Sequence, residues 1–143
     1  MKISTRGRYS LRMMIDLALH YEEGFISLKD ISARQDISKK YLEQIVPFLN
    51  RSNLLYSNKG HMGGYKLARP PYEITVRDIL ESAEGSLTPV SCMDNEPNQC
   101  EKCGECLTLP IYQGLYDVVI KYFESITLED IITCKINDFN YSI

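Results

Sequence analysis

Four of the five cysteines fall within a fifteen-residue segment, in the spacing Cys92-x7-Cys100-x2-Cys103-x2-Cys106. Thiols gathered in a polar stretch of Pro, Asn and Asp are not typical of a buried core, where cysteines usually occur singly. Thiolates at this spacing bind zinc, hold an iron–sulfur cluster or act as a redox-active pair. Because all three chemistries use soft sulfur ligands, the spacing alone does not distinguish them.

Charge is distributed unevenly along the chain. Residues 1–70 carry twelve Lys and Arg against six acids, a net charge of +6. Residues 71–143 carry four against thirteen, a net charge of −9. The overall charge of −3 therefore hides a basic half, which is typical of a surface that faces a polyanion. The alternative is a chance asymmetry on a solvated surface.

The basic half contains the sequence pattern of a helix-turn-helix. Apolar residues at three- and four-residue intervals predict a first helix over residues 9–21. Ser27, with Asp30 at the third helical position, caps a second helix that stops near residues 35–36. Ser38 caps a third helix, so a turn of about three residues joins the last two helices.

Two short β-prone runs follow the third helix and flank a glycine-rich basic tip. The runs are residues 54–56 and 65–67, and the tip SNKGHMGG between them supplies the Asn and Gly that a tight turn requires. A hairpin directly after a helix-turn-helix is a wing. Thr75 then caps a fourth helix, which ends at Gly85.

The start of the third helix is the segment that a helix-turn-helix inserts into the major groove of DNA. Gln44 suits an adenine edge and Glu43 accepts from cytosine, whereas Lys39 and Lys40 neutralise phosphate. Pro47 predicts a kink or an early end of the helix beyond this segment. The predicted DNA-binding residues are Ser38, Lys39, Lys40, Tyr41, Glu43, Gln44 and Arg51, with Lys59 and His61 at the wing tip. The two wing residues suit the minor groove or the flanking backbone.

A long helix from Pro110 to about Phe123 is apolar on more than one face. We expect one face to pack on the chain's own body and another on a second copy of the chain. Thr127 caps a last short helix. The predicted fold is mainly α with a small β-hairpin, a winged helix-turn-helix joined to a long dimerisation helix. Its parts are a DNA-binding domain at 1–85, a cysteine-rich loop at 86–106 and the dimerisation helix with the short C-terminal helix at 107–143.

Four segments resemble the Rrf-type bacterial transcription regulators, the family of IscR, NsrR and CymR. They are MKISTRGRYSLRMMIDLA, DISARQDISKKYLEQI, the GGYKLA that closes the hairpin and the later TLEDI. The resemblance extends over nearly the whole chain. It implies a homodimer in which long helices cross and two winged heads bind a pseudo-palindromic site on double-stranded DNA. Because the YLEQ motif is intact, the resemblance implies that Glu43 and Gln44 contact bases. Lys59 lies at the position where family members have a basic wing residue.

The resemblance also bears on the cysteine loop. In the iron–sulfur members of the family, three loop cysteines bind the cluster, and Cys92, Cys100 and Cys106 look like their counterparts. The IscR branch adds a histidine where this chain has Leu109. The NsrR branch uses an acidic residue near the position of Arg8. Neither of these two side chains ligates a metal.

Cys103 is an extra thiol relative to the family pattern, and we expect it to be the fourth ligand, with a backbone or partner-derived ligand as the alternative. The resemblance favours a 2Fe–2S cluster. A four-iron cluster, zinc and an unligated, thiol-redox loop are the alternatives. Since residues 86–106 lead into the dimer helix, ligation there is expected to modulate DNA binding by altering how the two heads are spaced.

Three other functions are alternatives to a DNA-binding regulator with an iron–sulfur cluster. A thiol–disulfide oxidoreductase would use Cys100-x2-Cys103, but such a motif opens a helix after a strand, a context that this loop lacks. A helix-turn-helix interaction module without DNA is a second alternative. A third is a repressor of cysteine metabolism that is controlled by zinc, thiols or a regulatory protein partner. The resemblance to CymR, a regulator controlled by a partner and not by a cluster, suggests this alternative. We expect a regulator and not an enzyme.

The remaining signals concern location and two isolated residues. No apolar run approaches the roughly 20 residues that cross a bilayer, and the N-terminus lacks a signal peptide, so a cytoplasmic location without membrane contact is expected. His20 is interpreted as a packed or surface histidine, and Cys134 as a small buried hydrophobe.

Overall fold

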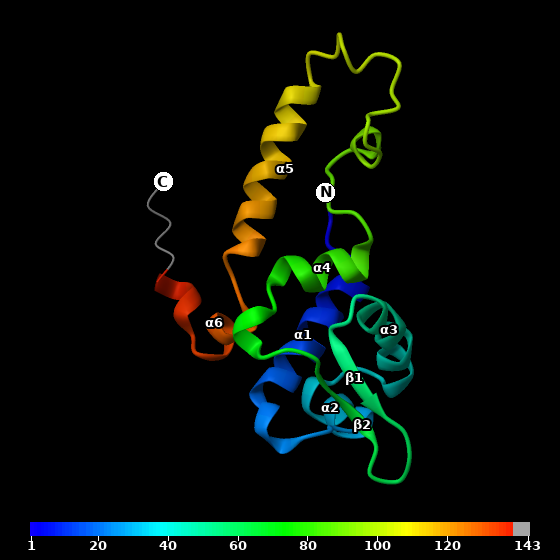
Figure 1. Cartoon of the computed structure of the whole chain (residues 1–143), viewed down its shortest axis with the longest axis vertical. Coiled ribbons are helices and arrows are strands. Elements are labelled where there is room, and N and C mark those ends of the chain that lie inside the picture. The colour runs from blue at the N-terminus through cyan, green and yellow to red at the C-terminus, as the bar shows by residue number, and fades with distance from the viewer. Residues whose placement is uncertain (139–143) are drawn as a thin grey trace.

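A computed structural model describes residues 1–138 of the chain, and the described part is mainly helical with one small hairpin. The elements in chain order are α1 (Thr5–Leu19), α2 (Leu28–Gln35), α3 (Lys39–Arg51), β1 (Leu55–Asn58), β2 (Gly64–Leu67), α4 (Val76–Glu84), α5 (Leu109–Glu124) and α6 (Leu128–Ile132). Short 3-10 helices are η1 (Tyr21–Glu23), η2 (Pro71–Glu73), η3 (Ser91–Met93) and η4 (Lys135–Asp138). In Figure 1 α5 projects away from the body formed by α1–α4 and the hairpin. The predicted fold class is confirmed.

Side-chain caps fix where most helices begin. Ser27, Ser38, Thr75 and Thr127 each accept a hydrogen bond from the backbone N–H three residues later, as predicted. These bonds satisfy N–H groups that have no partner within the helix. The first helix begins earlier than predicted, at Thr5, because Ser4 accepts from the Gly7 N–H at 3.1 Å.

The third helix runs through Pro47 to Arg51, so of the predicted kink or early end, the early end does not occur. A proline removes one helical hydrogen bond, here the bond to the carbonyl of Glu43. Pro47 and Glu43 both lie on the exposed side of α3. Ile45 and Leu49, on either side of the proline, are fully buried in the same core. Packing of this face keeps the helix continuous across the missing bond.

The hairpin forms where it was predicted, with β1 and β2 antiparallel from Leu55 opposite Leu67 to Asn58 opposite Gly64. Ile26, which links α1 to α2, extends this small sheet by exchanging two backbone hydrogen bonds of 2.8 Å with Tyr65. The approach is close enough that a Cβ on Gly64 would lie 2.3 Å from the Ile26 carbonyl oxygen. The base of the wing is therefore attached to the body by backbone bonds.

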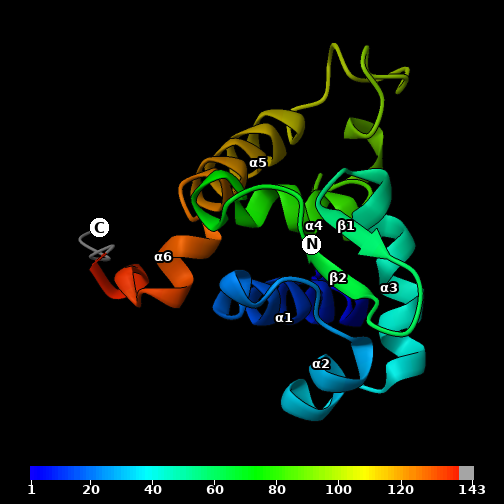
Figure 2. The same cartoon turned by 60° about the horizontal axis from the view of Figure 1, so that its bottom comes forward.

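Two buried clusters hold the body together. The larger surrounds α1, where Met13, Met14 and Leu17 are buried against α2, α3 and the hairpin. The smaller joins α4 to the base of α5, where Ile120 packs with Val76. Figure 2 shows α3 and the hairpin together at one end of the molecule and α6 at the other.

The start of α4 and the start of α6 are bonded to each other. The Val76 N–H donates to the Ile126 carbonyl and the Leu128 N–H to the Ile74 carbonyl, both at 2.9 Å. Arg77 of α4 also forms an ion pair with Glu124 at the end of α5. The base of α5 is thus attached to the DNA-binding half, while its start and the cysteine loop lie farther out (Figure 1). Within residues 1–138 no helix has the length and apolar character needed to cross a membrane.

Candidate nucleic-acid interface and cysteine loop

A buried ion pair sets the position of α2 on α1. The Asp16 carboxylate accepts from Arg34 Nη2 at 2.7 Å, from Arg34 Nε at 3.0 Å and from Gln35 Nε2 at 3.1 Å. Burial raises the pKa of Asp16, but the hydrogen bonds from Arg34 and Gln35 outweigh it and leave the pKa below its ordinary value. Asp16 is therefore ionised and ties the end of α2 to the last turn of α1.

The turn between α2 and α3 is held by local contacts. Asp36 adopts the left-handed conformation with φ 53°. Ser32 Oγ then donates to the Ile37 carbonyl at 2.5 Å, and Ile37 is buried. Ser38 follows as the cap of α3. Together with the Asp16 anchor, this turn determines which face of α3 is presented to solvent.

The predicted base-contacting residues lie on that exposed face. Lys39, Lys40, Glu43 and Gln44 are all exposed, whereas Leu42 and Ile45 face the core. The helix therefore presents a polar stripe from its first two turns, as major-groove readout requires. The structure places these residues on one surface.

Tyr41 lies differently from its predicted neighbours. It is half-buried and its ring meets that of Tyr9 edge-on, with the ring centroids 5.2 Å apart. The ring therefore packs α3 against α1. Only the outer edge of this side chain is available to a ligand.

Arg51, at the end of α3, is one of two guanidinium groups on the same aromatic ring. Its Cζ lies 4.6 Å from the Phe48 centroid, and the Cζ of Arg6 lies 4.2 Å from it. Arg6 also donates from Nε to the Ala83 carbonyl at 2.7 Å. Sequence reasoning missed Arg6 as a member of this basic site because 42 positions separate it from Phe48.

The wing carries further basic groups. Lys59 and His61 are exposed in the turn between the strands, as predicted. Lys66 was not predicted as a site residue. Its Nζ lies 4.7 Å from the Phe25 ring centroid and 6.0 Å from that of Tyr56, its cross-strand partner. Pairing between the strands is the signal that could have found it.

The four loop cysteines all have exposed surface but are not gathered into one site. Cys92 lies in η3, and a turn joins Cys100 to Cys103, whose N–H donates to the Cys100 carbonyl at 3.2 Å. Across residues 1–138, no three His, Cys, Asp or Glu side chains are close enough to hold one metal ion. The hydrogen bond between Cys106 Sγ and Thr108 Oγ1 lowers the pKa of the Cys106 thiol.

Two isolated residues were interpreted from the sequence. Cys134 is exposed, with φ 60°, so the prediction of a small buried hydrophobe is wrong. It follows the end of α6 and is the residue at which the backbone takes the left-handed conformation. His20 is half-buried and pairs with Glu23, in agreement with its interpretation as a packed or surface histidine.

The projecting part of α5 has an exposed apolar stripe. Ile111, Leu115 and Val118 are 67%, 44% and 68% exposed and occur at four- and three-residue spacing, on one side of the helix. Ile120, by contrast, is buried against α4. One of the two apolar faces predicted for this helix, the face that packs on the chain's own body, is confirmed.

The chain is similar to known transcription regulators over nearly its whole length. A family model described as Rrf2, iron-dependent transcriptional regulator, matches residues 3–134. Protein rrf2 of Nitratidesulfovibrio vulgaris is 37% identical over 131 residues, which are 92% of this chain and 87% of that protein.

Solved structures give the same result. CymR, the global cysteine regulator of B. subtilis, matches with a TM-score of 0.71 and 38% identity, over 93% of this chain and 97% of that one. IscR of T. potens matches with a TM-score of 0.75 and 34% identity, over 97% of this chain and 91% of that one.

Proposed function

Because this chain belongs to the Rrf2 family of transcription regulators, we propose that it is a cytoplasmic homodimer whose sequence-specific DNA binding is controlled through its cysteine loop. It is a DNA-binding regulator and not an enzyme, so the thiol–disulfide oxidoreductase alternative is set aside. The observation that carries the proposal is the exposed polar face of α3 beside a basic wing, on the half of the chain with net charge +6.

Base readout is assigned to the start of α3. Glu43 and Gln44 have exposed hydrogen-bonding groups that match cytosine and adenine edges in the major groove. Lys39 and Lys40 supply phosphate contacts, which give affinity and register. Lys59 and His61 extend the contact toward the minor groove or the flanking backbone.

Dimerisation is assigned to α5. The stripe of Ile111, Leu115 and Val118 exposes apolar surface that a second copy of the helix would remove from water. Two heads joined through crossing helices would bind two half-sites. The three-part organisation of the chain, with heads at 1–85, a loop at 86–106 and the dimer region at 107–143, follows from this arrangement.

The donor set of the loop fits a thiophilic cofactor. Four thiols with exposed surface lie within fifteen residues, and no residue of the segment 92–106 is buried, so ligation there would disrupt no core packing. We assign Cys92, Cys100 and Cys106 as ligands, with Cys103 as the fourth. A bound 2Fe–2S cluster would supply a redox couple. Zinc is the alternative for the same thiols.

Loading the loop would act on DNA through α5. The thiols lie apart in the structure, so ligation must draw the turns of residues 92–106 together. Cys106 is three residues from the start of α5, and a change there alters how the two heads are spaced. The effect on transcription requires that DNA bind the two loop states with different affinity.

A second candidate is a regulator controlled without a cluster. The observation that favours it is the likeness to CymR, a cysteine regulator, over 93% of this chain. In that case zinc, thiol oxidation or a protein partner would set the state of a repressor of cysteine metabolism.

Anaerobic purification with an absorption spectrum and counts of iron, zinc and acid-labile sulfide tests the assignment. We expect visible bands with iron and sulfide at about two per chain. Cys103→Ala should lower iron retention, whereas Cys134→Ala, outside the loop, is the matched control. A colourless protein with zinc, or with no metal after reconstitution, supports the second candidate. DNA affinity equal in the loaded and unloaded forms contradicts regulation through the loop.

A further inference from the structure

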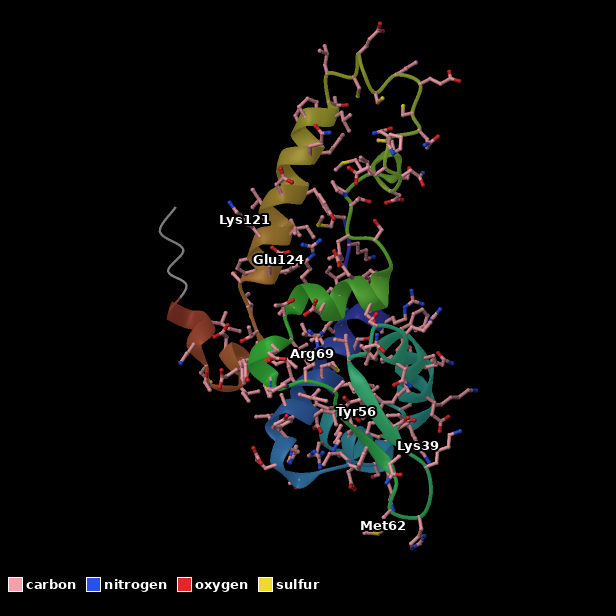
Figure 3. All side chains as sticks on the ribbon, viewed as in Figure 1. Lys39, Tyr56, Met62, Arg69, Lys121 and Glu124 are labelled. Atoms are coloured by element: carbon pink, nitrogen blue, oxygen red, sulfur yellow. The ribbon has the colours of Figure 1, made fainter. Side chains whose placement is uncertain are left out.

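The tip of the wing ends in an exposed thioether. Met62 is 85% exposed, and among the large apolar residues of the described chain only Leu107 is more exposed. Figure 3 shows Met62 at the far end of the hairpin, on the same side of the molecule as Lys39 at the start of α3. Nothing in the packing of the body accounts for an apolar side chain at this position.

The turn that carries Met62 has a defined backbone conformation. Gly60 has φ 118°, and the Gly63 N–H donates to the Gly60 carbonyl at 3.0 Å. A Cβ on Gly63 would lie 2.2 Å from the carbonyl oxygen of Asn58, so this position requires glycine. With the strands attached to the body through Ile26, the turn holds Met62 outward instead of letting it fold back onto the core.

The surroundings of Met62 are basic. No Asp or Glu occurs between Glu43 and Glu73, whereas Arg51, Lys59, Lys66 and Arg69 all fall in that interval. An exposed apolar tip on an acid-free, basic hairpin matches a narrow, negatively charged groove with apolar sugar walls. Proteins that bind the DNA minor groove insert apolar side chains, methionine included, between base steps.

We propose that Met62 is a DNA-contacting residue that inserts its thioether into the minor groove at the edge of the binding site. The proposal deepens the proposed function, because it rests on the wing facing DNA. Methionine suits this role since its unbranched, flexible side chain adapts to the groove and buries apolar surface against sugars and base edges. Met62 thereby favours sites whose minor groove is rich in A·T pairs, which lack the guanine amino group.

The test uses the full-length protein and a duplex selected with it from a random DNA pool. Binding of that duplex by wild type, Met62→Ala, Met62→Leu and Met62→Gln is compared by fluorescence anisotropy. Met62→Ala and Met62→Gln should each weaken binding by about tenfold, because the buried apolar surface is lost or replaced by an amide. Met62→Leu, which keeps the apolar surface, should bind within about threefold of wild type.

A change in the DNA then locates the contact. Replacing adenine by 2,6-diaminopurine at the wing-proximal A·T pairs adds an amino group to the minor groove and leaves the major-groove edge intact. This duplex should weaken wild-type binding and reduce the difference between wild type and Met62→Ala. The exposed Leu19→Ala, at the end of α1, is the matched control and should bind both duplexes as wild type does.

Salt dependence separates Met62 from its charged neighbour. Lys59→Ala should reduce the slope of log K against log salt by about 0.9, because one phosphate contact is lost. Met62→Ala should leave the slope unchanged. Equal binding by wild type, Met62→Ala and Met62→Gln overturns the proposal, as does a loss that is the same on both duplexes. Failure of the wild type to bind any selected duplex instead overturns the proposed DNA-binding function itself.

Discussion

The guanidinium of Arg34 binds the buried carboxylate of Asp16 through two hydrogen bonds, from Nη2 at 2.7 Å and from Nε at 3.0 Å. The Asp16 side chain is 1% exposed, whereas that of Arg34 is 36% exposed. The pair joins α2 to α1 and so determines the position of the turn that leads into α3. Because only Asp16 is fully buried, removal of Arg34 leaves a buried charge without a partner, whereas removal of Asp16 leaves a charge that reaches water.

Substitution of Arg34 should destabilise the protein more than substitution of Asp16. Arg34→Ala leaves a buried carboxylate without its charged partner, which costs about 3–5 kcal/mol. Asp16→Asn leaves Arg34 able to reach water and should cost about 1–3 kcal/mol. Urea unfolding at equal protomer concentration measures both values. Losses below about 1 kcal/mol for both variants would show that the pair contributes no more than a surface ion pair.

The same pair predicts a loss of stability in acid. The pKa of Asp16 in the folded chain lies below its ordinary value of 3.8, so its contribution to stability is fully present above pH 3.8. The contribution is lost as the pH falls through the lower folded pKa, because protonation of the carboxylate weakens the bond to Arg34. The free energy of unfolding measured across this range should fall more steeply in wild type than in Asp16→Asn. Parallel curves for the two proteins contradict this assignment.

Two substitutions in α3 should distinguish residues that contact bases from residues that bind phosphate. Gln44→Ala should cost about 1–3 kcal/mol of discrimination at one base-pair position. Lys40→Ala should weaken all duplexes alike and lower the salt slope by about 0.9. Both side chains are exposed, so neither change should alter folding. Competition binding with single-base variants of a selected duplex measures the two effects, and a uniform loss for Gln44→Ala would assign it to the backbone.

A charge on the outer face of α5 should prevent dimerisation. Val118 is 68% exposed, and Val118→Glu would place a carboxylate in the proposed interface without disturbing the core of its own subunit. Sedimentation equilibrium should show a shift from dimer to monomer, with at least tenfold weaker association. Leu19→Glu is the control outside the stripe and should remain dimeric. A Val118→Glu protein that stays dimeric places the interface elsewhere.

Local interactions account for the parts of the fold that were predictable. Ser27, Ser38, Thr75 and Thr127 mark helix starts because a cap bond joins residues only three positions apart, so the signal lies within a short stretch of sequence. The wing was predictable for the same reason, since the glycines that its turn needs, Gly60 with φ 118° among them, lie within a few residues of both strands. The exposed residues at the start of the third helix, Lys39, Lys40, Glu43 and Gln44, follow from helical periodicity.

The continuity of α3 was not predictable in this way. Pro47 removes a local bond, and local rules favour an end or a kink there. Whether the helix continues depends on the packing of Ile45 and Leu49 against residues from α1 and elsewhere in the chain. That balance is set by the whole core and has no signature near the proline.

Residue type and neighbours close along the chain specify four of the helix starts, the hairpin, the basic half and the set of thiols. Packing between distant segments buries Asp16 beneath Arg34, brings Arg6 and Arg51 to the ring of Phe48 and leaves Met62 clear of the body. These relationships join residues from separate elements or depend on what packs around them. Burial and the choice of partner depend on contacts between segments that are far apart in the sequence, so patterns of neighbouring residues do not specify them.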